Sequence, residues 1–294
     1  MGKIKAKKKK RTAAARISDF VQAGPISTYS ILFIVIPFLV LLFMSFMTKG
    51  PLGNIQYQFT LENYQTILEP VYWKVVKDSI IIAGISTIAT VVVGYPLAYY
   101  VAGKKPGASN AMLVLMMIPF WASELVILYS FVTLFNKEGI INNFLMDIGL
   151  IQAPLNLLYN KFAVVVGMVY ALLPFAVLPM YSSIEKMDKS LLEASKDLGA
   201  GPVKTFMNVT LPLTAPGMFA AVILVFIPSI GYYMITDMLG GGTNIMIGNV
   251  IYNQFTTARN WPFGAALSII LAVIILIMVA IYSRMGGDLD DLGV

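Results

Sequence analysis

The sequence contains no cysteine and no histidine. Without Cys there is no disulfide, no thiolate metal site and no thiol nucleophile, and without His the commonest general base and metal ligand is missing. Charged residues are also scarce, at 12% of the 294 residues. These absences count against most classes of enzyme and direct attention to the hydrophobic residues, which make up 58% of the chain.

The hydrophobic residues gather in long runs, and the mean hydropathy is +0.77. A helix needs about 20 apolar residues to cross a bilayer, and backbone groups within lipid must bond internally. The sequence therefore predicts an all-α membrane protein with six transmembrane helices, at residues 29–47, 79–102, 111–135, 162–184, 215–236 and 265–283. Prolines interrupt several of these spans and indicate either ordinary kinks or helices that bend around a pathway.

The basic residues indicate how the spans are oriented. With six spans, 15 of the 21 Lys and Arg lie on the side of both termini and six on the other. The positive-inside bias then places both termini in the cytosol. Eight of the basic residues lie within residues 3–16, a cluster suited to topology control or anionic lipid rather than to nucleic acid. A cleaved signal peptide is the alternative for this region, but the apolar run is long and no small-residue cleavage site follows.

This pattern predicts three regions. Residues 1–28 form a basic cytosolic tail, residues 29–283 a six-helix transmembrane domain, and residues 284–294 an acidic cytosolic tail with Asp288, Asp290 and Asp291. The outer loops at 48–78 and 136–161 are too short for domains of their own. Residues 59–68 can form a short surface helix there.

The cytosolic loop at residues 185–214 predicts two short helices. Asp188 or Ser190 can cap the first, and Gly199 can stop it. Pro202 suits the first position of the second helix, which continues to Pro212. Two such helices can be a mere connector, so the identity of their residues decides what the loop is for.

Three elements of this loop resemble a known pattern. The tripeptide Glu193-Ala194-Ser195, then Gly199, then Val209-Thr210-Leu211-Pro212 are similar to the EAA loop of ABC importer permeases. Ser195 replaces the usual second Ala and Val209 the usual Ile, both small changes in volume. The resemblance implies that this loop docks in a groove of a separate ATPase subunit, through Glu193, Ala194, Ser195, Gly199, Val209, Leu211 and Pro212.

The resemblance extends to segments 59–64, 94–99, 119–121, 173–186, 247–251 and 261–266, which look like those of PotB-type permeases of spermidine/putrescine importers. It implies the type I (MetI-like) permease fold and a location in the bacterial inner membrane. The implied partners are a second, PotC-like permease subunit, a PotA-like ATPase dimer and a PotD-like extracytoplasmic binding protein. No cofactor is expected on this chain, because ATP and Mg²⁺ would be bound by the ATPase. One departure is that Ile127 lies in the region where similar proteins carry an Arg, while Glu124 adds a carboxylate.

Ionisable residues inside spans are functional candidates by default. Glu124 is expected near the middle of the third span, one helical turn after Trp121. Asp237 is expected at the outer end of the fifth span, one turn after Tyr233. A carboxylate and an aromatic ring on one helix face suit an ammonium group. The alternative, structural interpretations are a neutral buried acid at Glu124, a helix cap at Asp237, and packing or interfacial roles for the rings.

Three functions follow from these features. A permease for polyamines or another small solute, powered by a partner ATPase, accounts for the loop, and the chain carries no phosphate-binding Gly-x4-Gly-Lys-Ser/Thr motif of its own. An ion-coupled secondary transporter would use Glu124 as a proton site and would leave the loop pattern a coincidence. A membrane-embedded enzyme is disfavoured, because His and Cys are missing.

Overall fold

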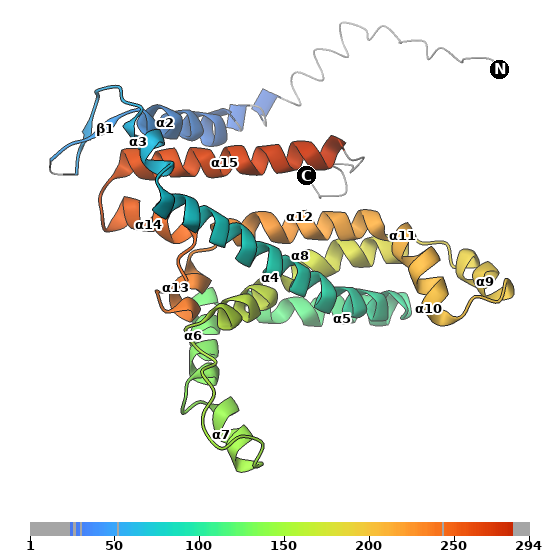
Figure 1. Ribbon diagram of the computed structural model, residues 1–294. Coiled ribbons are helices and arrows are strands. Elements are labelled where there is room, and N and C mark those ends of the chain that lie inside the picture. Colours follow the sequence, from blue (N-terminus) through green and yellow to red (C-terminus); the bar gives the residue numbers. More distant parts are fainter. Residues whose placement is uncertain (1–23, 26–27, 30, 52, 243, 285–294) are drawn as a thin grey trace, which may run out of the picture.

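The computed structural model describes residues 24–25, 28–29, 31–51, 53–242 and 244–284 (Figure 1). The two predicted tails lie almost wholly outside these residues. The longest helices among them are α4 (Pro70–Ala102), α8 (Lys161–Glu185), α12 (Ala215–Gly231) and α15 (Trp261–Arg284). The remaining elements are η1 (Ile31–Val35), α2 (Ile36–Ser45), β1 (Thr48–Lys49), β2 (Ile55–Gln56), α3 (Glu62–Ile67), α5 (Pro106–Met117), η2 (Ile118–Trp121), α6 (Glu124–Phe135), α7 (Ile140–Asp147), α9 (Ser190–Asp197), α10 (Pro202–Thr205), η3 (Phe206–Thr210), α11 (Leu211–Leu213), α13 (Met234–Gly240) and α14 (Ile247–Thr256).

The centre of the protein is formed by α4, α8 and α12, which pack against one another. Ala98 of α4, Ala176 of α8 and Ala221 of α12 are completely buried where these helices meet. Gly217 of α12 lies so close to Ser183 and to the backbone of Pro179 that a side chain would clash there. Small residues let helix backbones approach closely, which is how helices associate in lipid.

A second layer lies beside this core. In Figure 1, α2 and α15 run side by side above α12, and these two helices are in contact. Both expose large apolar side chains, such as Leu39 and Phe43 of α2 and Leu276 of α15. Such side chains suit contact with lipid tails rather than with water.

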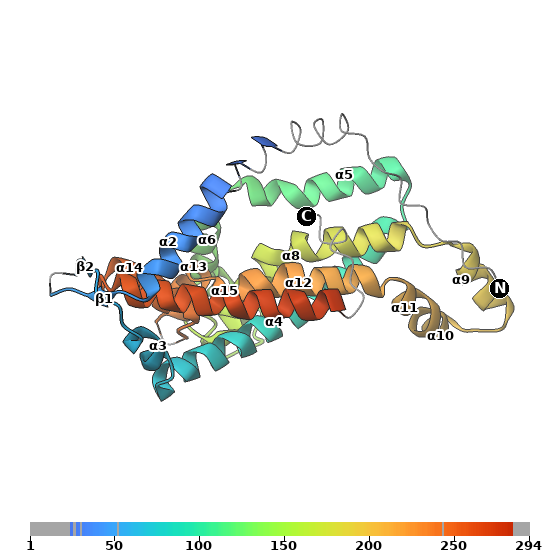
Figure 2. The same ribbon diagram turned by 90° about the horizontal axis from the view of Figure 1, so that it is seen from above.

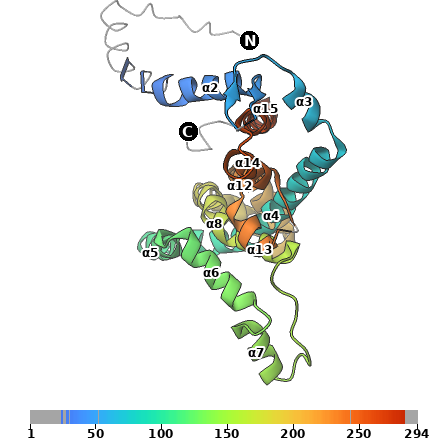
Figure 3. The ribbon, with the colours of Figure 1, turned by 90° about the vertical axis from the view of Figure 1, so that its left-hand side faces the viewer.

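The third predicted span differs from its expectation. Residues 111–135 were expected to form one helix, but α5 and η2 end at Trp121, and α6 leaves at 86° to them. Ala122 has extended backbone dihedrals of −70° and 153°, and Pro119 removes a backbone N–H just before the bend. Figure 3 shows α6 and α7 extending away from the bundle as an arm.

The fifth span is also broken, because α12 ends at Gly231 and α13 begins at Met234. Tyr232 between them is extended, with dihedrals of −71° and 108°. Within the described residues, three helices can cross a membrane by length and composition alone. Two bent pairs qualify as broken spans or re-entrant loops, namely Pro106–Trp121 with Glu124–Asp147, and Pro202–Leu213 with Ala215–Gly231, which meet at 65°. The stretch Ile31–Ser45 is apolar but shorter. Six continuous spans are therefore not confirmed, although each predicted segment corresponds to an apolar helix or bent pair.

One end of the bundle carries the predicted surface helix as α3, together with a hairpin of β1 and β2 that the sequence did not indicate. Asn63 of α3 donates hydrogen bonds to the carbonyls of Ser45 and Met47. These bonds attach the hairpin and α3 to the end of α2.

Candidate functional site

The predicted docking loop folds as helix, turn and helix. The Asp188 carboxylate accepts a hydrogen bond of 2.9 Å from the Ser190 N–H at the start of α9, which lowers the pKa of that carboxyl below its ordinary value. After α9 ends, Gly199 adopts φ of +78°, a conformation that other residues rarely take. Pro202 then begins α10, as predicted, and η3 and α11 continue the chain to Leu213.

The turn presents apolar side chains outward. Leu198, which directly precedes Gly199, is 89% exposed, and Val203, four residues after Gly199, is 75% exposed. Glu193 and Ala194 are exposed on α9. The hydroxyls of Ser195 and Thr205 lie 3.0 Å apart and join the two helices. The result is a braced elbow at one end of the protein (Figure 2).

The second arm of this elbow is anchored in the core. Phe206 packs edge-on against Tyr95 of α4 at 5.7 Å between ring centroids. Tyr95 also reaches Thr214, at the joint where α11 gives way to α12. Val209 and Leu211 are half-buried, and Pro212 is exposed. The predicted docking residues therefore fall into two groups. Glu193 and Ala194 lie on the exposed surface of the elbow, and Val209 and Leu211 lie in the half-buried arm that joins it to the core.

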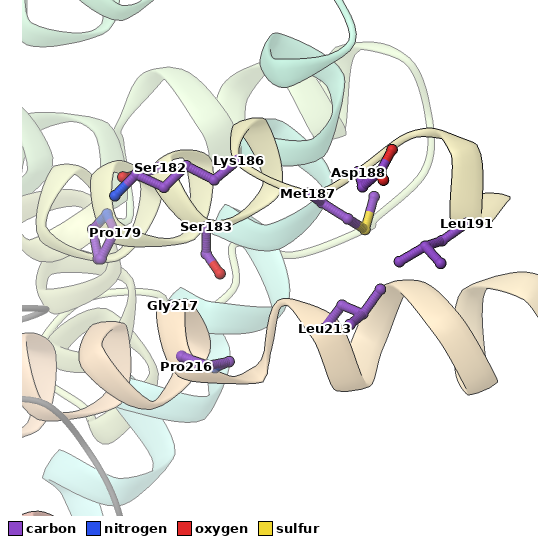
Figure 4. Close-up of a pocket in the computed structure, with 10 residues that line it drawn as sticks. All are labelled: Pro179, Ser182, Ser183, Lys186, Met187, Asp188, Leu191, Leu213, Pro216 and Gly217. Carbon is purple, nitrogen blue, oxygen red and sulfur yellow. The ribbon is translucent and has the colours of Figure 1, made fainter. Parts of the chain in front are cut away.

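A cavity of about 540 Å³ separates the first arm of the elbow from the bundle. Figure 4 shows its lining, which comes from the end of α8, the start of α9 and the joint of α11 with α12. Lys186 and Asp188 supply its charged groups, and Leu191 and Leu213 face each other across it. The cavity lies between α9 and the membrane helices, whereas Phe206 packs directly on Tyr95 of α4.

The two broken spans meet at a second site. Glu124 is the first residue of α6, and Tyr232 lies in the break between α12 and α13. Both residues line a cavity of about 260 Å³ and a second cavity of about 470 Å³. Glu124 thus lies at a junction of two cavities, not at the middle of a continuous helix as expected.

Trp121 does not share a helix face with Glu124. The extended residues Ala122 and Ser123 separate the two, so the expected one-turn spacing is lost. Trp121 is 80% exposed and does not line either cavity as described. The expected pairing of this ring with the Glu124 carboxylate is therefore wrong.

Tyr233 and Asp237 do lie one turn apart at the start of α13, where the Asp237 N–H donates to the Tyr233 carbonyl at 2.8 Å. Asp237 is exposed. The Tyr233 ring stacks on Tyr252 of α14, with centroids 4.4 Å apart and an angle of 10° between planes. Asn249 holds this region by donating to the Tyr233 carbonyl at 3.1 Å.

Sequence reasoning missed Tyr232, Tyr252, Asn249 and the rings that line the smaller cavity. Tyr232 is the neighbour of Tyr233, and Asn249 lies in segment 247–251, which the motifs had already marked. The sequence therefore carried a signal near both residues. Nothing in the local sequence shows which of two neighbouring tyrosines faces Glu124.

The model of one protein family, the binding-protein-dependent transport system inner membrane component, matches residues 94–286. The spermidine/putrescine transport system permease protein PotB of Escherichia coli K12 is 41% identical over 254 residues, which are 86% of this chain and 92% of that protein. PotB of Haemophilus influenzae is 40% identical over 259 residues, covering 88% of this chain and 91% of the relative.

Two solved structures share the fold. A chain of a bacterial ABC transporter involved in the import of the acidic polysaccharide alginate superposes with a TM-score of 0.73 at 18% identity, covering 92% of this chain and 97% of that one. A chain of the MetNI methionine ABC transporter, in an inward-facing conformation, gives a TM-score of 0.53 at 18% identity and covers 74% of this chain and 96% of that one.

Proposed function

Because this chain belongs to the family of binding-protein-dependent transport system inner membrane components, we propose that it is the non-catalytic permease subunit of an ATP-driven importer of spermidine and putrescine. Its homologues are permeases of spermidine/putrescine transport systems, which confirms the resemblance expected from its motifs. It is a multi-pass membrane protein with the MetI-like fold.

The exposed elbow at Gly199 is the observation that supports docking to a partner ATPase. Leu198 and Val203 would be costly to leave in water, and exposed apolar groups ringed by polar ones are typical of protein interfaces. The elbow is also braced by the bond between Ser195 and Thr205. A rigid apolar projection of this kind suits a groove in another subunit better than a connector between helices.

The proposed assembly contains this chain, a second permease subunit similar to PotC, two ATPase subunits similar to PotA and an extracytoplasmic binding protein similar to PotD. ATP and Mg²⁺ would be held by the ATPase subunits. Closure of the ATPase pair would push the elbow, and the contact of Phe206 with Tyr95 would carry that movement to α4. The elbow and both termini are assigned to the cytosol, in keeping with the basic residues of that side.

The proposed pathway for the solute passes the broken spans. Glu124, Tyr233 and Asp237 place carboxylates and aromatic rings around the breaks. A ring face contributes about 0.5 to 2 kcal/mol to binding of an ammonium group. Trp121 remains a candidate only for the outer approach, since it is exposed away from both cavities.

Reconstitution of the complex in lipid vesicles tests this proposal. With the second permease, the ATPase and the binding protein present, labelled putrescine or spermidine should accumulate only when ATP is supplied to the elbow side. This chain alone should move no solute. Accumulation driven by a proton gradient without ATPase would instead support the secondary transporter, and ATP-driven uptake of a different solute would retain the permease but change its substrate.

A further inference from the structure

The smaller of the two cavities at the broken spans is lined largely by aromatic rings. They belong to Phe120, Phe131, Tyr170, Phe175 and Tyr232. Tyr170 stacks on Phe120 at 5.3 Å and meets Phe131 edge-on at 5.3 Å, so these three rings form one connected wall. The remaining lining is apolar or small, except for a single carboxylate, that of Glu124.

Glu124 is exposed at the junction of the two cavities, so its carboxylate can be reached by a solute. Its negative charge attracts a cation. Tyr232, which lines both cavities with it, provides a hydroxyl but no positive charge. Among the described residues that line either cavity, none is Lys or Arg. A cation brought by the solute would complete the site.

The shape of the site restricts that cation. About 260 Å³ is below the range of roughly 300 to 1,000 Å³ that holds a whole drug-sized ligand. The space fits the end of a chain. The neighbouring cavity of about 470 Å³ begins at the same two residues and continues along α12 and α15, past Pro228 and Leu271. A linear molecule can therefore place one end among the rings and the rest in the larger cavity.

We propose that the ring-lined cavity binds one protonated primary amine end of a linear alkylamine, with Glu124 as the counter-charge and Tyr232 as the residue that orients the carboxylate and determines specificity. The rings receive the methylene groups and present their faces to the ammonium. A primary ammonium donates three hydrogen bonds and is compact, whereas an amine with methyl groups on its nitrogen would be too wide and would donate fewer. This inference rests on the proposed function, because it takes a polyamine as the solute.

The test compares two solutes in the reconstituted complex, with the same binding protein throughout. Uptake of putrescine is measured against uptake of its N,N,N′,N′-tetramethyl derivative in the wild type and in Glu124→Gln, Tyr232→Phe and Glu138→Gln variants. Glu138 is an exposed carboxylate beyond α6 and is the matched control. Glu124→Gln should lower the preference for putrescine by about tenfold, the scale of one lost charge-assisted contact. Tyr232→Phe keeps the ring and should lower it severalfold, and Glu138→Gln should leave it unchanged.

ATP hydrolysis without solute reports whether each variant assembles. A normal basal rate with an unchanged putrescine preference in both Glu124→Gln and Tyr232→Phe would overturn the site. If Glu124→Gln fails to assemble, Tyr232→Phe carries the test by itself, since it removes only one oxygen. Failure of the wild-type complex to take up either amine would instead overturn the proposed function, and the two failures are thereby distinguished.

Discussion

The hydroxyl oxygens of Tyr95 and Thr214 lie 2.8 Å apart and join α4 to the joint between the docking elbow and α12. Thr214 already donates its hydrogen to the Thr210 carbonyl at 2.8 Å, so Tyr95 is the donor in this pair. Both residues are buried. A movement of the elbow would therefore reach α4 through a directed hydrogen bond as well as through the ring of Phe206.

Replacing Tyr95 with Phe tests this connection. The variant keeps the ring that packs on Phe206 and loses one buried hydrogen bond, worth about 1 kcal/mol. We expect normal assembly and ATP hydrolysis, but fewer solute molecules imported per ATP. The measurement is the ratio of labelled solute taken up to phosphate released. Tyr100→Phe, on the same helix but 57% exposed, is the control and should keep the wild-type ratio.

The turn of the elbow gives a matched pair of glycines. Gly199 has φ of +78°, whereas Gly201 has φ of −69°, and a Cβ on either would meet no atom within 4 Å. Gly199→Val should therefore be strained by its backbone alone, by about 1 to 2 kcal/mol, and should lose uptake and copurification with the ATPase while staying in the membrane. Gly201→Val adds the same side chain without that strain. Equal behaviour of the two variants would show that the conformation at Gly199 is not required.

The sequence was sufficient to predict this elbow because its signals are local. Gly199 and Pro202 each act on the backbone within a few residues, so the turn and the start of the second helix lie where expected. The spans followed from apolar runs for a similar reason. What local signals did not give was the break at Ala122, where the run of apolar residues continues through a bend of 86°.

That Glu124 and Tyr232 line the same cavities could not be predicted from the sequence. These residues are far apart in the chain, and each lies at a break, Glu124 after the bend at Ala122 and Tyr232 between α12 and α13. Helical spacing instead paired Glu124 with Trp121, which assumed an unbroken helix. The one-turn relation of Tyr233 and Asp237 was predicted successfully because both belong to the start of a single helix.

Asn249 is the polar centre that fixes the position of Tyr233. Its Oδ1 accepts hydrogen bonds from the Met246 N–H at 3.0 Å and from the Thr236 hydroxyl at 2.6 Å. Asn249→Leu keeps a similar volume but leaves the buried Met246 N–H without its partner, at about 1 to 3 kcal/mol. The Thr236 hydroxyl can still donate to the Tyr233 carbonyl. We expect a lower melting temperature of the purified complex and reduced uptake. Asn253→Leu, one turn further along α14 on an exposed face, should change neither.

Asp237 tests whether the carboxylate at the start of α13 acts on the solute. It is exposed, so Asp237→Asn should cost little stability. If its charge attracts a polycation, loss of the charge should slow import of the triamine spermidine more than that of the diamine putrescine, because more positive charges are involved. The effect should shrink as salt rises, since exposed charges are screened.

The matched control for this substitution is Asp147→Asn, which removes an exposed carboxylate from the end of α7. Initial rates of uptake for both amines, each at low and high ionic strength, are the measurement. A carboxylate that only stabilises the first turn of α13 would affect the two amines equally and independently of salt. Slower spermidine import at low salt, seen in Asp237→Asn and absent in Asp147→Asn, is therefore the pattern that an electrostatic role requires, because helix stabilisation cannot depend on the number of charges that the solute carries.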